Sequence, residues 1–246
     1  MKCISSILIF FAITANLESQ TRIDLQIDAS VAVDYIVTNP AGKQSGIDAR
    51  VVDKSGEPVL LHEIPNAGYG YMSVGKSDPK DETSESTEFN AGFLSPQGDG
   101  VYQIDLIGNK LASFNIYLTL SSHDTTRAQD AQFSILDAPI DKDSVVTYLF
   151  TYHEAPGSPV SFTKVVSVTS LIQDVTVMRK FGWIKNQAAA DKYVNYFCSI
   201  KLQASANNFN GARAILQTVL SDAKNDRTRK KLTSKAFKLI HSDTAT

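Results

Sequence analysis

Apolar and polar positions alternate with a period of two between residues 20 and 168, which predicts β-strands with one buried face. The alternation is clearest in five segments, at residues 31–37, 101–107, 114–120, 145–152 and 160–168. Turn-forming sequences rich in Gly, Pro and Asn lie between the segments, and no helical period interrupts them. This pattern predicts an Ig-like antiparallel β-sandwich over residues 20–168, and an extended hairpin at residues 131–168 is a candidate part of it.

Beyond this region the apolar period changes to about 3.6, which predicts helices. Ser170 and Gln173 have the spacing of a capping box, so the first helix is expected to begin at Ser170 and to end near Gly182. Asn186 and Thr233 are candidate caps of later helices. Short connections between the helices predict an antiparallel bundle of three or four helices over residues 170–246.

Two residues of this bundle are expected to pack between helices. Trp183 directly follows the predicted end of the first helix, and an indole there is interpreted as a packing residue. Cys198 lies between Phe197 and Ile200 in an apolar stripe, so we interpret it as a helix-packing residue rather than as a nucleophile.

The first residues have the order of a secretory signal peptide. The basic Lys2 precedes an apolar stretch from Ile4 to Ile13, and small or polar residues follow from Thr14 to Gln20. The apolar stretch is about half as long as a membrane-spanning helix. A buried N-terminal helix or strand is the alternative. We expect residues 1–19 to be a signal peptide, and the mature protein to be secreted or held at the cell surface without spanning the membrane.

Charge is divided unequally between the two halves. Residues 21–170 contain 10 Lys and Arg against 20 Asp and Glu, a net charge of −10. Residues 171–246 contain 13 against 5, a net charge of +8. The basic half is therefore expected either to dock on the acidic half or to meet an external anionic surface.

Seven of the basic residues are concentrated within fifteen positions, and they are the candidate site for a polyanion: Lys224, Arg227, Arg229, Lys230, Lys231, Lys235 and Lys238. A solvated helix end is the alternative interpretation, because cations are favoured near a helix C-terminus. No aromatic residue lies among these basic residues before Phe237. Sites for single-stranded nucleic acid stack the bases on aromatic side chains, so no specific nucleic-acid partner is expected.

An acidic stretch at residues 75–88 is the candidate cation site. Its carboxylates are the hard oxygen ligands that Ca²⁺ prefers, and four of them are the candidate ligands: Asp78, Asp81, Glu82 and Glu85. Their spacing fits no EF-hand, and a solvated loop is the alternative. No other cofactor is expected.

No catalytic motif is visible in the sequence. The four histidines, His62, His123, His153 and His241, are far apart and lack the spacing of metal ligands. The sequence has no nucleophile elbow, phosphate loop or dinucleotide fingerprint. We therefore expect a protein that is not an enzyme.

Two family resemblances add to this interpretation. The segment from Phe181 to Asn186, the Ala-rich helix after it and the Asn208–Ala212 turn resemble the FIMAH module, a small helical module related to FIVAR modules of secreted bacterial proteins. The segments 37–46 and 63–69 resemble a β-sandwich domain of bacterial surface and secreted proteins. These resemblances imply a helical appendage without catalytic residues, attached to a surface-protein sandwich.

Together these features favour a secreted, non-catalytic surface or interaction protein with an adhesive or structural role, which binds a cell-wall or extracellular glycan or a protein partner. An accessory subunit or degenerate relative of a secreted hydrolase is the alternative, because folding can assemble a site that the sequence does not reveal. Polyanion binding through the basic helical part is a further alternative.

Overall fold

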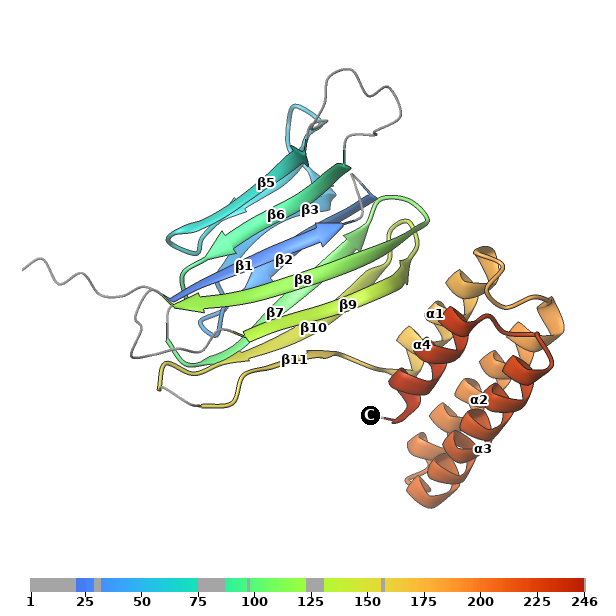
Figure 1. Ribbon diagram of the computed structural model, residues 1–246. Coiled ribbons are helices and arrows are strands. Elements are labelled where there is room, and N and C mark those ends of the chain that lie inside the picture. The colour runs from blue at the N-terminus through green and yellow to red at the C-terminus, as the bar shows by residue number, and fades with distance from the viewer. Residues whose placement is uncertain are drawn as a thin grey trace, which may run out of the picture.

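The computed structural model describes residues 21–28, 32–74, 87–96, 98–122, 131–155 and 158–245. These residues form two packed antiparallel sheets followed by four helices, which confirms the predicted fold class (Figure 1). The signal-peptide prediction lies outside the described residues. Among the described helices none is long and apolar enough to cross a membrane.

The first sheet has five strands in the order β5–β6–β1–β8–β9. Their bounds are Ala67–Val74 for β5, Thr87–Leu94 for β6, Thr21–Asp28 for β1, Ala112–Ser122 for β8 and Ala131–Ile140 for β9. The second sheet has six strands in the order β11–β10–β7–β2–β3–β4. Their bounds are Ser161–Lys164, Val145–Tyr152, Gly100–Gly108, Val33–Thr38, Gln44–Val52 and Pro58–His62.

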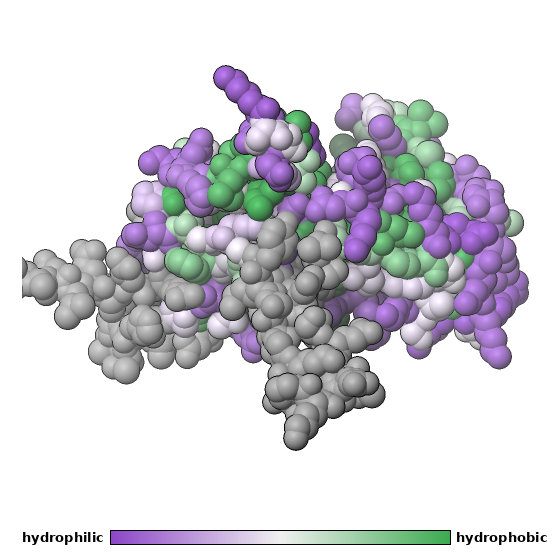
Figure 2. All heavy atoms as spheres, turned by 90° about the horizontal axis from the view of Figure 1, so that it is seen from above, coloured by the Kyte–Doolittle hydropathy of each residue, from purple (hydrophilic) through white to green (hydrophobic). Residues whose placement is uncertain are grey.

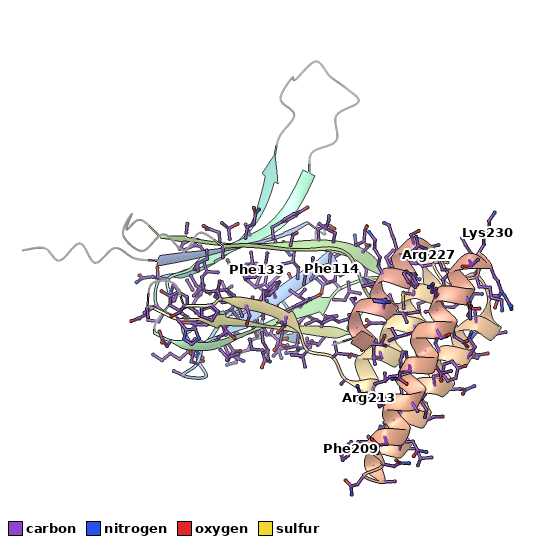
Figure 3. The ribbon with its side chains drawn as sticks, turned by 60° about the horizontal axis from the view of Figure 1, so that its bottom comes forward. Phe114, Phe133, Phe209, Arg213, Arg227 and Lys230 are labelled. Atoms are coloured by element: carbon purple, nitrogen blue, oxygen red, sulfur yellow. The ribbon has the colours of Figure 1, made fainter. Side chains whose placement is uncertain are left out.

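The sandwich core forms because alternate residues of each strand point between the sheets. In β10 every second residue from Val146 to Tyr152 is buried, as the period of two predicts. Phe114 of β8 and Phe133 of β9 lie between the sheets (Figure 3), and the rings of Phe133 and Phe150 meet edge to face at 6.4 Å. Aromatic pairs in this geometry stabilise a core beyond the area that they bury.

Residues 131–168 do not form one extended hairpin. Strand β9 pairs with β8 in the first sheet, whereas β10 pairs with β7 and β11 in the second, so the hairpin of this region consists of β10 and β11 only. The register of β8 and β9 shifts between Phe114 and Ile116, and Asp137 at this bulge has a positive φ of 57°. Such a bulge redirects the side chains of an edge strand.

The four helices are α1 (Val168–Lys180), α2 (Gln187–Ser205), α3 (Phe209–Thr228) and α4 (Ser234–Ala245). The predicted caps at Asn186 and Thr233 are confirmed, because their side chains accept from Ala189 N and Ala236 N. Gly182, at φ 69°, follows the C-cap of α1, as predicted.

The start of α1 differs from the sequence prediction. The capping box is formed by Ser167 and Ser170, not by Ser170 and Gln173, and the Ser167 hydroxyl oxygen accepts from Ser170 N at 3.0 Å. Strand β11 ends at Lys164, although alternating residues continue to Val168. Three residues therefore suffice to turn the chain from the strand into the helix.

The helices enclose a core separate from that of the sandwich. Its largest fully buried residues are Tyr193 and Phe197 of α2, and Ile184 is completely buried beside them. Trp183 is half-buried, packs against this core and stacks on Phe181 at 4.9 Å. The interpretation of Cys198 as part of the buried stripe was wrong: it is exposed, because it lies one residue beyond Phe197 and so faces away from the core.

Helices α1 and α4 lie nearest to the sandwich, and α2 and α3 lie farther away (Figure 1). At this seam Lys164 of β11 donates to Asp174 of α1 and to Asp243 of α4, each at 2.7 Å. Burial raises the pKa of Asp174 to about 6, although the Lys164 ammonium opposes that shift. The seam therefore joins a strand to the first and last helices through one buried lysine.

Candidate anion-binding groove between helices α3 and α4

The seven predicted basic residues divide into two groups. Lys231 pairs with the buried Asp226 at 3.5 Å, and Lys235 pairs with Asp137 of β9 while its ammonium lies 5.4 Å from the centre of the Trp183 ring. The other five are exposed and pair with no carboxylate among the described residues: Lys224, Arg227, Arg229, Lys230 and Lys238. Two of the seven therefore form ion pairs within the protein, and five form none among the described residues.

A groove of about 690 Å³ lies between α3 and α4 at the end of the bundle that carries this second group. Five residues of α3 and two of α4 line it: Leu220, Ser221, Lys224, Arg227, Thr228, Phe237 and His241. In Figure 3 Arg227 and Lys230 lie at one end of α3, whereas Phe209 and Arg213 lie toward the other end. Among the described residues, no carboxylate lines the groove. Its charged lining is therefore cationic.

The amphipathic pattern of the two helices explains where the groove lies. On α3 the buried positions include Val219 and Ala223, and on α4 they include Ala236 and Ile240. Each of these four buried residues is followed directly in the sequence by a residue that lines the groove. The groove therefore runs along the boundary between the buried apolar face and the exposed face of each helix. The groove is thus formed by the same helix packing that buries the core.

Arg227 is held in place by an aromatic ring. Its guanidinium carbon lies 4.8 Å from the centre of the Phe237 ring, and the Phe237 and His241 rings lie 5.6 Å apart. A guanidinium over an aromatic face is attracted by the ring, and its planar N–H edge stays free to donate two parallel hydrogen bonds. The arrangement can accordingly present Arg227 to an oxyanion with little freedom left to lose.

The carboxylates near this region are engaged elsewhere. Asp222 and Asp226 both accept from Lys192 of α2, and they also accept from Tyr196 and Tyr193 respectively. These bonds hold the pKa of Asp222 below its usual range. Since both carboxylates of α3 face α2, they leave the cations of the groove without an internal counter-charge.

Docking of the basic half on the acidic half, one of the two arrangements that the charge division left open, occurs in part, and contact with an external anionic surface stays a prediction. Lys180 of α1 pairs with Asp141, and Lys235 of α4 pairs with Asp137, so part of the basic half docks on the acidic sandwich. In the space-filling view, hydrophilic residues gather on the side of the helical part that faces away from the sandwich (Figure 2). Docking consequently uses only a minority of the basic side chains.

The other candidate chemistry is not assembled by the described residues. Asp78, Asp81, Glu82 and Glu85 lie outside the described residues, so the calcium prediction stays a prediction. Among the residues that the structure describes, no group of three or more His, Cys, Asp or Glu side chains could hold a metal ion.

A second, much smaller cavity lies inside the sandwich. It measures about 20 Å³ and is lined by residues such as Tyr35, Gly46 and Gly92. The Tyr35 hydroxyl is buried and has no hydrogen-bond partner among the described residues, and burial raises its pKa. A cavity needs about 10–15 Å³ to hold one water molecule, so this cavity suits a single water and no larger ligand.

Sequence reasoning found the density of cations but missed the residues that shape the groove. In the sequence Phe237 is only the first aromatic residue after the basic run, and His241 is one of four widely separated histidines. The signal that could have identified them is the spacing of Phe237 and His241, four residues apart on a predicted helix. A short connection makes α4 a neighbour of α3, so this pair faces Lys224 and Arg227.

No protein-family model, curated protein or solved structure matches the chain. The resemblances to FIMAH modules and to bacterial surface sandwiches therefore rest on the short motifs quoted above. What the fold itself establishes is two antiparallel sheets followed by four helices.

Proposed function

We propose that this chain is an exported, non-catalytic binding protein whose helical part binds an anionic extracellular partner, with an acidic glycan as the best-fitting class. The sandwich acts as the scaffold that carries the helices. The observation that supports the proposal is the groove between α3 and α4, whose described lining contains two exposed cations and no carboxylate. Clefts lined by one sign of charge concentrate ligands of the opposite sign.

Two further features agree with this proposal. The resemblance of residues 171–240 to FIMAH-type modules implies an appendage of a secreted protein, and the first residues have the order of a signal peptide. Arg229, Lys230 and Lys238 extend the cationic surface beyond the groove, so a polymer with repeated charges has further residues to contact.

The test is retention of the mature protein on immobilised heparin, used as a generic anionic glycan. The test variant replaces two exposed cations of the groove with Ser: Lys224 and Arg227. The control variant makes the same change of charge on two exposed residues elsewhere in the helical part: Lys201 and Arg213. Lys231 is left intact in both because it pairs with the buried Asp226.

We expect the wild-type protein and the control variant to elute at higher salt than the test variant, because salt competes with each ionic contact that the ligand makes. Equal elution of the two variants would show that only net charge matters and would refute a localised binding face. Failure of the wild-type protein to bind heparin or any other anionic glycan would refute the proposed function.

A further inference from the structure

The geometry points to a more specific ligand: we infer that the groove is a subsite for a single sugar ring that carries an oxyanion, either a carboxylate or a phosphate or sulfate ester. This inference rests on the proposed function and identifies the chemical unit that the site would recognise. Arg227 binds the oxyanion, and the rest of the groove accommodates the hydroxylated ring.

The case for one anionic group begins with Arg227. Its guanidinium carbon lies 4.8 Å from the centre of the Phe237 ring, and the edge that remains free can bind two oxygens of one oxyanion in a bidentate manner. Lys224 lies three residues earlier on α3 and lines the same groove, where its ammonium adds a second positive charge. A cation already held by packing loses less side-chain entropy on binding than a free one does.

The case for a sugar ring comes from the remaining lining. Ser221 and Thr228 bring hydroxyl groups into the groove, and the Thr228 hydroxyl donates to the carbonyl of Lys224, so its oxygen remains available to accept. Leu220 and Phe237 supply apolar surface beside these hydroxyls. A sugar ring has hydroxyl groups at its edge and apolar C–H groups on its faces, so it matches both kinds of lining.

The groove is large enough for a sugar ring. Ligand pockets measure about 300–1,000 Å³, and the groove, at about 690 Å³, lies within that range. An extended polymer can place a unit in the groove while its neighbouring charges contact the exposed cations at the end of α3.

The test is a titration of the isotope-labelled mature protein, followed by the NMR signals of the helical part. Four probes are used separately: glucuronate, glucose 6-phosphate, glucose and inorganic phosphate. N-Acetylglutamate serves as a fifth probe, because it carries carboxylates without a sugar ring and represents an acidic peptide.

We expect both anionic sugars to shift the signals of groove residues in a saturable way. Their affinity should exceed that of glucose and of inorganic phosphate by about ten-fold or more, since each of these probes lacks one of the two recognised features. The two anionic sugars differ in their oxyanion, so comparing their affinities shows whether the groove prefers a carboxylate or a phosphate ester. If neither glucuronate nor glucose 6-phosphate binds better than inorganic phosphate and N-acetylglutamate, the inference of a ring subsite is overturned.

Two conservative variants test the assigned geometry. Arg227→Lys keeps the charge but loses the planar edge that can donate two parallel hydrogen bonds, so we expect an affinity loss of about ten-fold. Arg213→Lys makes the same change on an exposed residue at the other end of α3 and should bind as the wild type does. Unchanged affinity of Arg227→Lys would overturn the role of the guanidinium.

Phe237→Leu provides a second line of evidence, with its thermal unfolding measured alongside to confirm that the helices remain folded. It removes the ring that orients Arg227, so the anionic sugars should bind more weakly while heparin retention decreases little. If the wild-type protein binds heparin but none of the single sugars, the subsite inference fails and the proposed function stands. If it binds neither, both fail.

Discussion

Replacing Lys164 with Met tests whether the seam depends on one buried charge. The Lys164 side chain is 15% exposed, and the carboxylates that it contacts, Asp174 and Asp243, are 8% and 9% exposed. Burial lowers the pKa of Lys164, but the two carboxylates more than offset this effect, and the net result is a raised pKa. Lysine is therefore charged at neutral pH, and methionine would fill a similar volume without that charge.

The expected cost is large because two buried carboxylates would lose their shared cation. Removing one partner of a buried ion pair typically destabilises a protein by about 3–5 kcal/mol, and we expect Lys164→Met to fall in that range near neutral pH. Lys235→Met is the matched control: it also removes a seam lysine, but the two side chains of the Lys235–Asp137 pair are 48% and 49% exposed. Exposed pairs contribute less than about 1 kcal/mol.

Denaturant-induced unfolding of both variants and the wild type measures these costs. The free energy lost by Lys164→Met should shrink between about pH 7.5 and pH 5, because Asp174, whose pKa burial raises to about 6, then takes up a proton and no longer needs a cation. A cost for Lys164→Met no larger than that for Lys235→Met would refute the claim that the buried triad holds the seam. A cost that stays constant with pH would show that lost packing, not charge, is responsible.

Three other predictions follow from single contacts. The stability of Asp174→Asn relative to the wild type should increase as the pH rises through about 6, which unfolding at several pH values measures. The reason is that the pKa of Asp174 is raised in the folded state, so its ionisation destabilises the folded wild type and has no counterpart in the variant. Gly92→Ala should destabilise the sandwich by about 1–3 kcal/mol in thermal unfolding, because a Cβ at this position would lie 1.6 Å from the Tyr35 hydroxyl oxygen. Adding Tyr35→Phe, which removes that oxygen, should partly restore the stability of the Gly92→Ala variant. The half-buried Trp183, stacked on Phe181, should give fluorescence emission between the buried and water-exposed limits, and a fully exposed spectrum would contradict that packing.

The sequence was sufficient for the features that depend on local periodicity and capping. The change of period near residue 170 identified the transition from strands to helices, and the Asn186 and Thr233 caps were readable because an N-cap acts within its own first turn. The start of α1 was missed because Val165 to Val168 continue a strand-like alternation. The strand instead ends at Lys164, whose ammonium donates to carboxylates of two helices that lie later in the chain. The local alternation contains no information about these contacts.

The assignment of strands to sheets was beyond the reach of the pattern. Strands β9 and β10 are joined by a short turn at residues 141–144 and both alternate, which is typical of a hairpin, yet they belong to different sheets. A period of two identifies which residues of a strand are buried but not which strand is its neighbour. The candidate site divides in the same way. The cationic residues could be predicted because they are dense in the sequence. That Phe237 and His241 line the groove could not be predicted, because it depends on how α4 packs on α3.

The division of charge between the halves suggests simple attraction, but the buried contact of the seam has the opposite polarity. Its cation, Lys164, belongs to the acidic half, and its two carboxylates, Asp174 and Asp243, belong to the basic half. Net charge therefore does not determine how the halves dock, and the lysine pairs at Asp137 and Asp141 add only partly exposed contacts. Salt screens exposed charges much more than buried ones. The same increase in salt that would release an anion from the groove should consequently leave the buried triad, and with it the orientation of the helical part, largely unchanged.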